Sequence, residues 1–142
     1  MAPRRLALGL LDAADWFNDG LLSALAAAGW PQLSRHQAQV FPLLGPDGVS
    51  QSEISRRLGI TRQSVNTLVH ELIAVGVLEH RPDPDDRRAK RVVLTAQGRR
   101  LAADAAQILD RMEQHLADRI GADHVAALRV AVEADWGEPP IF

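Results

Sequence analysis

The chain has 142 residues, of which 46% are hydrophobic, 4% aromatic and 24% charged, and these proportions suit one domain with an apolar core. It contains no cysteine, which excludes disulfides, thiolate metal sites and thiol-based redox sensing. The N-terminal residues lack the apolar stretch of a signal peptide, and no run approaches the ~18 apolar residues of a membrane helix. We therefore expect a soluble, cytoplasmic protein without a membrane partner.

The formal net charge of −2 is unevenly distributed along the chain. Residues 53–100 hold ten basic and six acidic side chains, whereas the rest of the chain holds six basic and twelve acidic ones. A basic segment between acidic segments produces a field with one attractive face. This pattern is compatible with nucleic-acid binding, although uneven surface charge also occurs in proteins with other functions.

Two helices are predicted in the first third of the chain. Apolar residues recur with helical spacing over residues 5–28, and Pro31 lies just beyond this stretch, where a helix has ended. Ser34 and Gln37 have the spacing of a capping box that begins the second helix. Pro42 lacks the N–H group that would continue this helix, so we expect a kink or an early end there.

The next two predicted helices have the spacing of a helix-turn-helix. Ser50 and Glu53 form a second capping box before a short helix that ends at Gly59. Thr61 then caps a fourth helix that continues to about Val75. The short connection between these two helices is typical of helix-turn-helix motifs.

The fourth helix is predicted to have an apolar face and a polar face. The apolar face consists of Val65, Leu68, Val69, Leu72 and Ile73. Arg, Gln and Asn side chains read base edges in the major groove, and hydroxyl groups donate to phosphates. The polar face also lacks an acidic residue before Glu71, although acids are favoured at the start of a helix. An anionic partner explains this omission; the alternative is an ordinary amphipathic helix with a solvated polar face.

On the first interpretation, residues 61–75 form a recognition helix that enters the major groove. Its predicted DNA contacts are Thr61, Arg62, Gln63, Ser64, Asn66, Thr67 and His70.

An antiparallel hairpin is predicted after this helix. Residues 77–81 and 90–95 are rich in β-formers and flank a charged, turn-rich loop. An arginine on a thin loop can enter the narrow minor groove, and a neighbouring carboxylate can hold the guanidinium in one geometry. The predicted wing, residues 82–91, offers Asp86, Arg87, Arg88, Lys90 and Arg91 to DNA. The alternative is a solvated turn whose charges neutralise one another.

Two helices are predicted to complete the chain, the first capped by Thr95 and broken at Gly121. The expected fold is mainly α with a small β-hairpin wing, as a winged helix-turn-helix plus a helical dimerisation region. We expect a single domain over 1–142, with the winged helix at about 34–98 and the dimerisation region at 4–30 and 96–136.

The terminal helices carry more apolar positions than the middle segment can cover. This predicts a homodimer that holds two recognition helices about one DNA turn, ~34 Å, apart. The alternative is a monomer in which both ends fold back onto the middle.

From residue 34 to residue 98 the sequence resembles the MarR family of winged-helix regulators. The matching stretches are residues 50–65, 72–78 and 83–98. In the last stretch the family pattern of Asp-x-Arg, then Val, Leu-Thr and Gly falls on Asp86, Arg88, Val92, Leu94, Thr95 and Gly98. Pro42 departs from the usual pattern, and Ser55 stands where the family commonly has Ala.

The resemblance implies that Arg88 is the minor-groove residue and that Asp86 is its orienting partner. It also implies an obligate homodimer built by the first helix and the last two, with a ligand pocket between the dimer region and the DNA-binding part. The implied function is a ligand-responsive repressor that binds a pseudo-palindromic operator in double-stranded DNA. A small aromatic or amphipathic molecule is the implied effector.

Several large apolar residues are candidates for the lining of such a pocket: Trp16, Phe17, Trp30, Phe41 and Met112. Residues of this kind more commonly belong to the core.

An enzyme is the main rival interpretation. The histidines at positions 36, 70, 80, 115 and 124 fall into no short metal-ligand spacing, although a weak regulatory metal site stays open, and no catalytic constellation is evident. We therefore expect no enzymatic activity and no cofactor. A winged-helix module that binds proteins instead of DNA is the second rival.

Overall fold

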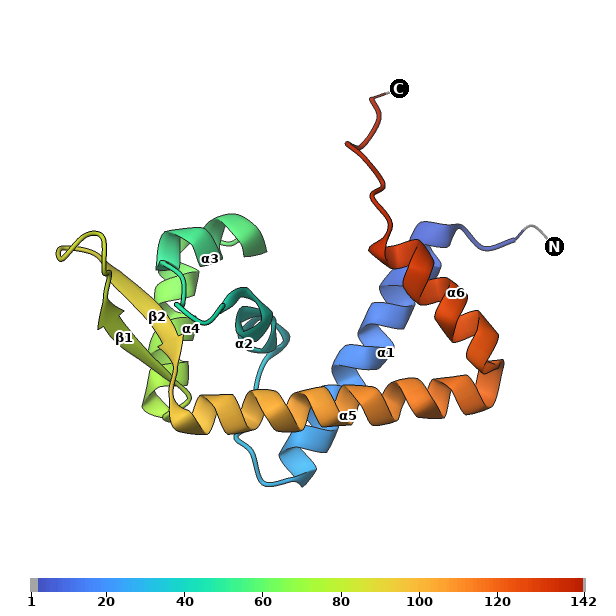
Figure 1. Cartoon of the computed structure of the whole chain (residues 1–142), viewed down its shortest axis with the longest axis horizontal. Coiled ribbons are helices and arrows are strands. Elements are labelled where there is room, and N and C mark those ends of the chain that lie inside the picture. Colours follow the sequence, from blue (N-terminus) through green and yellow to red (C-terminus); the bar gives the residue numbers. More distant parts are fainter. Residues whose placement is uncertain (1–2, 142) are drawn as a thin grey trace.

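The computed structural model describes residues 3–141, and within this part the chain forms six α-helices, a 3-10 turn and a two-stranded antiparallel hairpin (Figure 1). In chain order the elements are α1 (Leu6–Ala27), α2 (Arg35–Val40), η1 (Phe41–Leu43), α3 (Gln51–Leu58), α4 (Arg62–Ala74), β1 (Leu78–Pro82), β2 (Lys90–Leu94), α5 (Ala96–Ile120) and α6 (Ala122–Glu133). The predicted fold class is confirmed.

The long helix α5 connects two parts of the molecule. Figure 1 shows α2, α3, α4 and the hairpin at one end of α5, α6 at the other end, and α1 crossing α5 between them. Helix α1 crosses close to α5. A Cβ atom at Gly20 would overlap the end of the Met112 side chain. None of the helices formed by residues 3–141 is both long and apolar enough to cross a membrane.

Helix α2 begins and ends where the sequence indicates. The backbone N–H of Gln37 donates to Ser34 Oγ at 3.2 Å, and the backbone N–H of Ser34 donates to Gln37 Oε1 at 2.9 Å. The predicted capping box is therefore confirmed. The α-helix ends at Val40, and the chain passes through Pro42 as a 3-10 turn. The predicted early end is confirmed as well.

The second predicted capping box is only half correct. The backbone N–H of Glu53 donates to Ser50 Oγ at 3.2 Å, but the Glu53 carboxylate accepts from Arg56 at 3.0 Å and 2.6 Å. A guanidinium offers a charge-assisted, two-pronged contact that a neutral backbone N–H cannot match. The hydrogen bonds from Arg56 lower the pKa of Glu53.

The turn between α3 and α4 is closed by a serine. Gly59 adopts φ 65°, a left-handed conformation that ends α3. The hydroxyl of Ser55 donates to the Ile60 carbonyl at 2.6 Å, across the turn. Ser55 thus supports the connection that sets the angle between the two helices.

A short third strand segment accompanies the hairpin, and the sequence did not predict it. In the hairpin, Leu78 pairs with Leu94 and His80 with Val92. On its other side, Val92 pairs with Val49, with N–H···O distances of 3.1 Å and 2.8 Å. This pairing joins the loop before α3 to the wing.

Most of the continuous apolar core lies in the winged-helix part, which consists of α2, α3, α4 and the hairpin. Its fully buried members include Val40, Ile54, Val65, Val69, Leu72, Val77 and Val92. By contrast, α1 contributes only Leu25 to the buried residues, and α6 contributes none. Large apolar side chains stay exposed on the terminal segments, including Leu6 at 72%, Val130 at 71% and Trp136 at 63%.

Candidate nucleic-acid interface

The polar residues predicted on the fourth helix lie on one exposed face of α4. Burial of Val65, Leu68, Val69 and Leu72 fixes the rotation of this helix against the core. Five of the predicted DNA-contact residues therefore point outward together: Arg62, Gln63, Asn66, Thr67 and His70. Such a surface presents donors and acceptors that suit base edges.

The N-terminus of α4 is held by its cap and carries no acid. The backbone N–H of Ser64 donates to Thr61 Oγ1 at 3.1 Å, and the Thr61 hydroxyl donates to Ser64 Oγ at 2.8 Å. The first turn contains no Asp or Glu, so the positive end of the helix dipole is not neutralised there. This end of the helix favours an anion.

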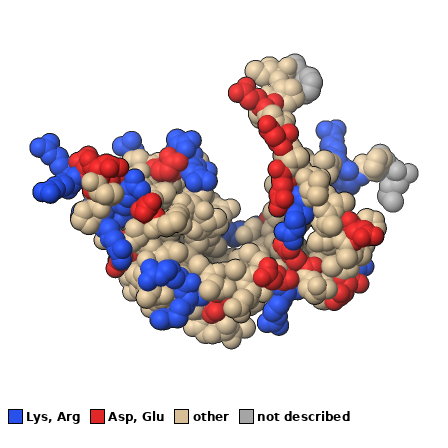
Figure 2. Space-filling model, viewed as in Figure 1, with Lys and Arg blue, Asp and Glu red and all other residues tan. Residues whose placement is uncertain are grey.

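The tip of the wing is a defined turn. The backbone N–H of Asp83 donates to the Ala89 carbonyl at 3.0 Å, and that of Ala89 donates to the Asp86 carbonyl at 3.0 Å. Arg87 and Arg88 are exposed at this tip. Figure 2 shows basic side chains at the far end of the hairpin and around the neighbouring winged-helix elements.

Asp86 acts on the backbone of the wing. Its Oδ1 accepts from the backbone N–H of Arg88 at 3.0 Å, and none of the ion pairs found in residues 3–141 joins its carboxylate to the Arg88 guanidinium. An aspartate side chain commonly hydrogen-bonds the backbone two residues further on. Asp86 thus shapes the turn that presents Arg88, and the expectation that its carboxylate holds the Arg88 guanidinium is not met.

Arg91 is set apart from the exposed cations of the wing. Its Nε donates to Asp83 Oδ2 at 2.9 Å, and its Nη1 donates to the Gly48 carbonyl at 3.4 Å. Both partners of this ion pair are largely covered, with side-chain exposures of 29% and 16%. The hydrogen bond from Arg91 is the main cause that lowers the pKa of Asp83. Arg91 therefore ties the base of the wing to the loop before α3.

The residues proposed for one effector pocket are distributed over different places. Phe41 lines an apolar cavity of about 250 Å³ between α1, η1 and α5. Trp16 and Met112 line a second cavity, and Phe17 lines a third one with α5 and α6. Trp30 instead donates from Nε1 to Asp104 Oδ2 at 2.8 Å.

The separation of Trp16 from Phe17 has a simple reason. Consecutive residues point about 100° apart around a helix with 3.6 residues per turn, so they face different neighbours. The expectation of a single pocket lined by all five residues is therefore not met.

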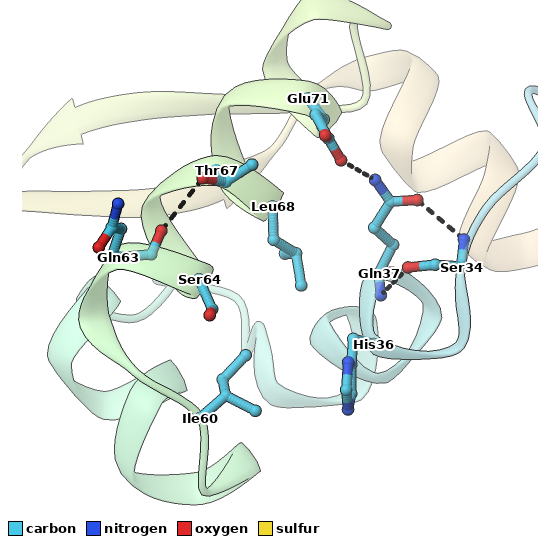
Figure 3. Close-up of a pocket in the computed structure, with 9 residues that line it drawn as sticks. All are labelled: Ser34, His36, Gln37, Ile60, Gln63, Ser64, Thr67, Leu68 and Glu71. Atoms are coloured by element: carbon cyan, nitrogen blue, oxygen red, sulfur yellow. Dashed lines mark hydrogen bonds between the residues drawn. The ribbon is translucent and has the colours of Figure 1, made fainter.

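A groove of about 470 Å³ lies between α2 and α4 (Figure 3), and the sequence did not predict it. Its lining consists of Ser34, His36, Gln37, Ile60, Gln63, Ser64, Thr67, Leu68 and Glu71. At one end, Gln37 Nε2 donates to Glu71 Oε2 at 2.7 Å and joins the two helices. No sequence pattern indicated this contact, because the two residues lie 34 positions apart.

A further ionic contact joins α1 to α2. The Arg35 guanidinium donates to Asp15 Oδ1 and to Asp19 Oδ1, the latter at 2.7 Å. The hydrogen bonds that Arg35 donates to Asp19 and Asp15 are the leading causes that raise its pKa. The start of α2 is thus fixed to α1 as well as to α4.

A helix-turn-helix followed by an antiparallel hairpin defines a winged-helix protein. A model of the MarR family matches residues 32–89, the part that contains α2, α3, α4 and most of the wing. Apo MarR from E. coli superimposes with a TM-score of 0.76 at 19% identity, covering 93% of this chain and 97% of that chain. Residues 32–89 thus match the MarR family, and the chain as a whole has the fold of MarR.

Other similar proteins include the transcriptional repressor CouR. In its complex with a 23-mer DNA duplex, CouR is 29% identical over 90% of this chain and 89% of that chain, with a TM-score of 0.71. CouR from Rhodococcus jostii RHA1 bound to p-coumaroyl-CoA is 24% identical over 96% and 95% of the two chains, with a TM-score of 0.70.

Uncharacterized proteins of Mycobacterium tuberculosis and Mycobacterium bovis are 30% identical over 91 residues. This match spans 64% of the chain and 64% of each mycobacterial protein.

The Asp83–Arg91 contact leads to a prediction about the order of the wing. We predict that Asp83→Asn lowers the hydrogen-exchange protection of the amides of residues 85–89 at neutral pH, because Arg91 loses its charged partner. In the wild type, the pKa of Asp83 is lowered. The stabilisation of the wing by the Asp83–Arg91 ion pair is therefore present above the ordinary Asp pKa of about 4 and is lost as the pH falls through the lowered pKa. Acidification below about pH 4 should therefore lower the hydrogen-exchange protection of the same amides.

Asp85→Asn is the matched control, since it changes a carboxylate in the same turn that lies outside the Asp83–Arg91 ion pair. Equal loss of protection in the two variants would contradict the assignment of this role to Asp83.

Proposed function

We propose that the protein is a DNA-binding transcriptional regulator that binds a pseudo-palindromic operator as a homodimer. The observation that carries this proposal is the exposed, acid-free start of α4 beside a turn with two exposed arginines. Both features are arranged for an anionic partner, since they leave positive charge and donors without protein acceptors. The match of residues 32–89 to the MarR family supports the same function.

The proposed base-reading element is α4, residues 61–75 with its cap, in the major groove. Arg62, Gln63 and Asn66 occupy its first two turns, which lie nearest the bases when a recognition helix enters by its N-terminal end. Their side chains can form paired hydrogen bonds with base edges. Thr61, Ser64, Thr67 and His70 lie beside them, toward the phosphates.

The proposed minor-groove element is the wing, residues 82–91. Arg88 is the residue assigned to the groove, and Asp86 fixes the backbone of the turn that presents it. Arg87 and Lys90 are exposed on the same loop and its base, where they can neutralise phosphates. Arg91 contributes indirectly, because it donates to Asp83 within the wing and to the Gly48 carbonyl in the loop before α3.

The homodimer follows from the apolar surface of the terminal helices. Leu6, Leu11 and Val130 are 72%, 63% and 71% exposed in the single chain. Apolar patches of this kind on a protein surface mark interaction sites. A two-fold pairing of α1, α5 and α6 would cover them and would place two copies of α4 about one DNA turn, ~34 Å, apart.

A small effector is proposed for the cavity under Phe41. This cavity lies between α1, η1 and α5, and its lining is almost wholly apolar, with Leu21, Ala105 and Leu109 among its members. It therefore suits an apolar group. The related repressor CouR has been crystallised with p-coumaroyl-CoA, an acyl thioester with an aromatic end. Effector binding would favour a dimer whose recognition helices are mis-spaced for the operator, which makes the protein a ligand-responsive repressor.

Replacement of the wing arginine tests the DNA-binding proposal. Duplexes retained by the purified protein from fragmented genomic DNA provide the ligand. We predict that Arg88→Ala weakens binding about tenfold or more and lowers the log–log salt slope by about 0.9 for each lost phosphate neutralisation. Fluorescence anisotropy over a salt series measures both quantities.

Arg119→Ala, in the last turn of α5 and far from the wing, is the control and should leave both values unchanged. If the wild type retains no duplex, or if Arg88→Ala binds as the wild type does, the DNA-reading proposal is wrong and a protein-binding winged helix takes its place.

Filling the cavity under Phe41 tests the effector proposal. A thermal-shift screen of lipophilic acids, phenols and aryl thioesters is first used to find a ligand that raises the melting temperature. We predict that Ala105→Leu abolishes this shift while operator binding is retained, because the added methyl groups occupy the cavity.

Ala103→Leu makes the same change at an exposed position of α5 outside this lining and should preserve the shift. A shift that survives Ala105→Leu, or a screen without a single ligand, would remove the support for this cavity as an effector site.

A further inference from the structure

We propose that His36 is a proton-dependent contact to a DNA phosphate, so that operator affinity rises as the pH falls from 8 to 6. This inference rests on the proposed function and adds a residue on α2 to the predicted DNA-binding surface. It concerns the groove between α2 and α4, which lies beside the recognition face (Figure 3).

The position of the groove follows from how a helix enters DNA. A helix in the major groove has a phosphate backbone on each side of it. The helices that pack beside α4 within the winged-helix part are α3 and α2. The groove on the α2 side shares Gln63 and Thr67 with the exposed polar face of α4. A strand that flanks α4 on this side would therefore pass the mouth of the groove.

The chemistry of the groove differs between its two ends. Glu71 lies at one end, where its carboxylate is bonded to Gln37 at 2.7 Å. Figure 3 shows His36 at the other end, on the α2 side, across from Ser64 and Ile60. The Glu71 end repels a phosphate, whereas the other end offers a hydroxyl and an imidazole. The favourable place for a phosphate is thus between His36 and Ser64.

His36 is the residue in the groove lining that can supply a positive charge. The neighbouring Arg35 is already engaged by Asp15 and Asp19 of α1. Glu71 is the acidic residue that faces the groove from α4, and α3 contributes no charged group to the lining. Protonation of His36 would therefore turn a polar groove into a cationic one.

The backbone around His36 is held from two sides. Ser34 and Gln37 form the capping box at the start of α2, and Gln37 also reaches Glu71 on α4. Arg35 fixes the same turn to α1 through Asp19 at 2.7 Å. A side chain on such a fixed turn loses less conformational entropy on binding than one on a mobile loop.

The sign of the pH effect follows from proton linkage. Imidazole changes its charge between pH 5 and 8, and only the protonated form makes a charge-assisted contact to phosphate. Because DNA stabilises the protonated form, binding takes up protons, and affinity increases as the pH falls. His80 is a weaker source of this effect, since burial, with smaller contributions from Lys90 and His70, lowers its pKa and disfavours its charged form.

The test compares operator binding by the full-length protein at pH 6 and pH 8 at constant ionic strength. We expect the wild type to bind roughly fivefold to tenfold more tightly at pH 6, with a salt slope steeper by about 0.9 per chain. His36→Gln should show the wild-type pH 8 affinity and salt slope at both pH values. His36→Lys carries a charge at both pH values and should bind at pH 8 as the wild type does at pH 6, a gain that a merely structural role would not produce.

His115→Gln on α5 is the matched control and should keep the wild-type pH dependence. A pH dependence that persists in His36→Gln, or one that disappears in His70→Gln instead, would overturn the inference while leaving the proposed function intact. Absence of wild-type DNA binding at both pH values would contradict the proposed function itself, and this inference with it.

Discussion

The rotation of α4 about its own axis decides which of its side chains are buried and which face solvent. Val65, Val69 and Leu72 are fully buried, and they leave the helix one way to lie against α2, α3 and the hairpin. Because apolar positions three and four residues apart occupy one side of a helix, the polar residues between them must face outward. The wing follows soon after this helix in the chain, since β1 begins four residues after the end of α4.

The two parts of the molecule differ in how their apolar side chains are covered. The winged-helix part contains most of the buried apolar core and is reinforced by polar contacts between distant segments, such as Arg91 with Gly48 and Gln37 with Glu71. The terminal helices leave large apolar side chains such as Leu6 and Val130 exposed. A second copy of the chain is the proposed cover for them. On this view, the same association that buries the apolar surface also sets the spacing of the two recognition helices.

The local signals in the sequence predicted the elements well, because caps and helix ends depend on neighbouring residues. Thr61 and Thr95 cap their helices as expected, and Pro42 ends α2. Contacts between distant segments were not predictable in the same way. The pairing of Val49 with Val92 and the groove between α2 and α4 arise only when the chain is folded. The effector residues were expected together because they are large and apolar, but Phe41, Phe17 and the pair Trp16–Met112 line three separate cavities.

In the proposed complex, one DNA duplex is bound by two copies of this winged helix about one turn apart. Native mass spectrometry of the complex gives the number of chains, and hydroxyl-radical footprinting of the same duplex gives their spacing. We expect two chains per duplex and two related protected patches whose centres are separated by about one helical turn, ~10 base pairs. One chain per duplex, or a single protected patch without two-fold symmetry, would contradict it.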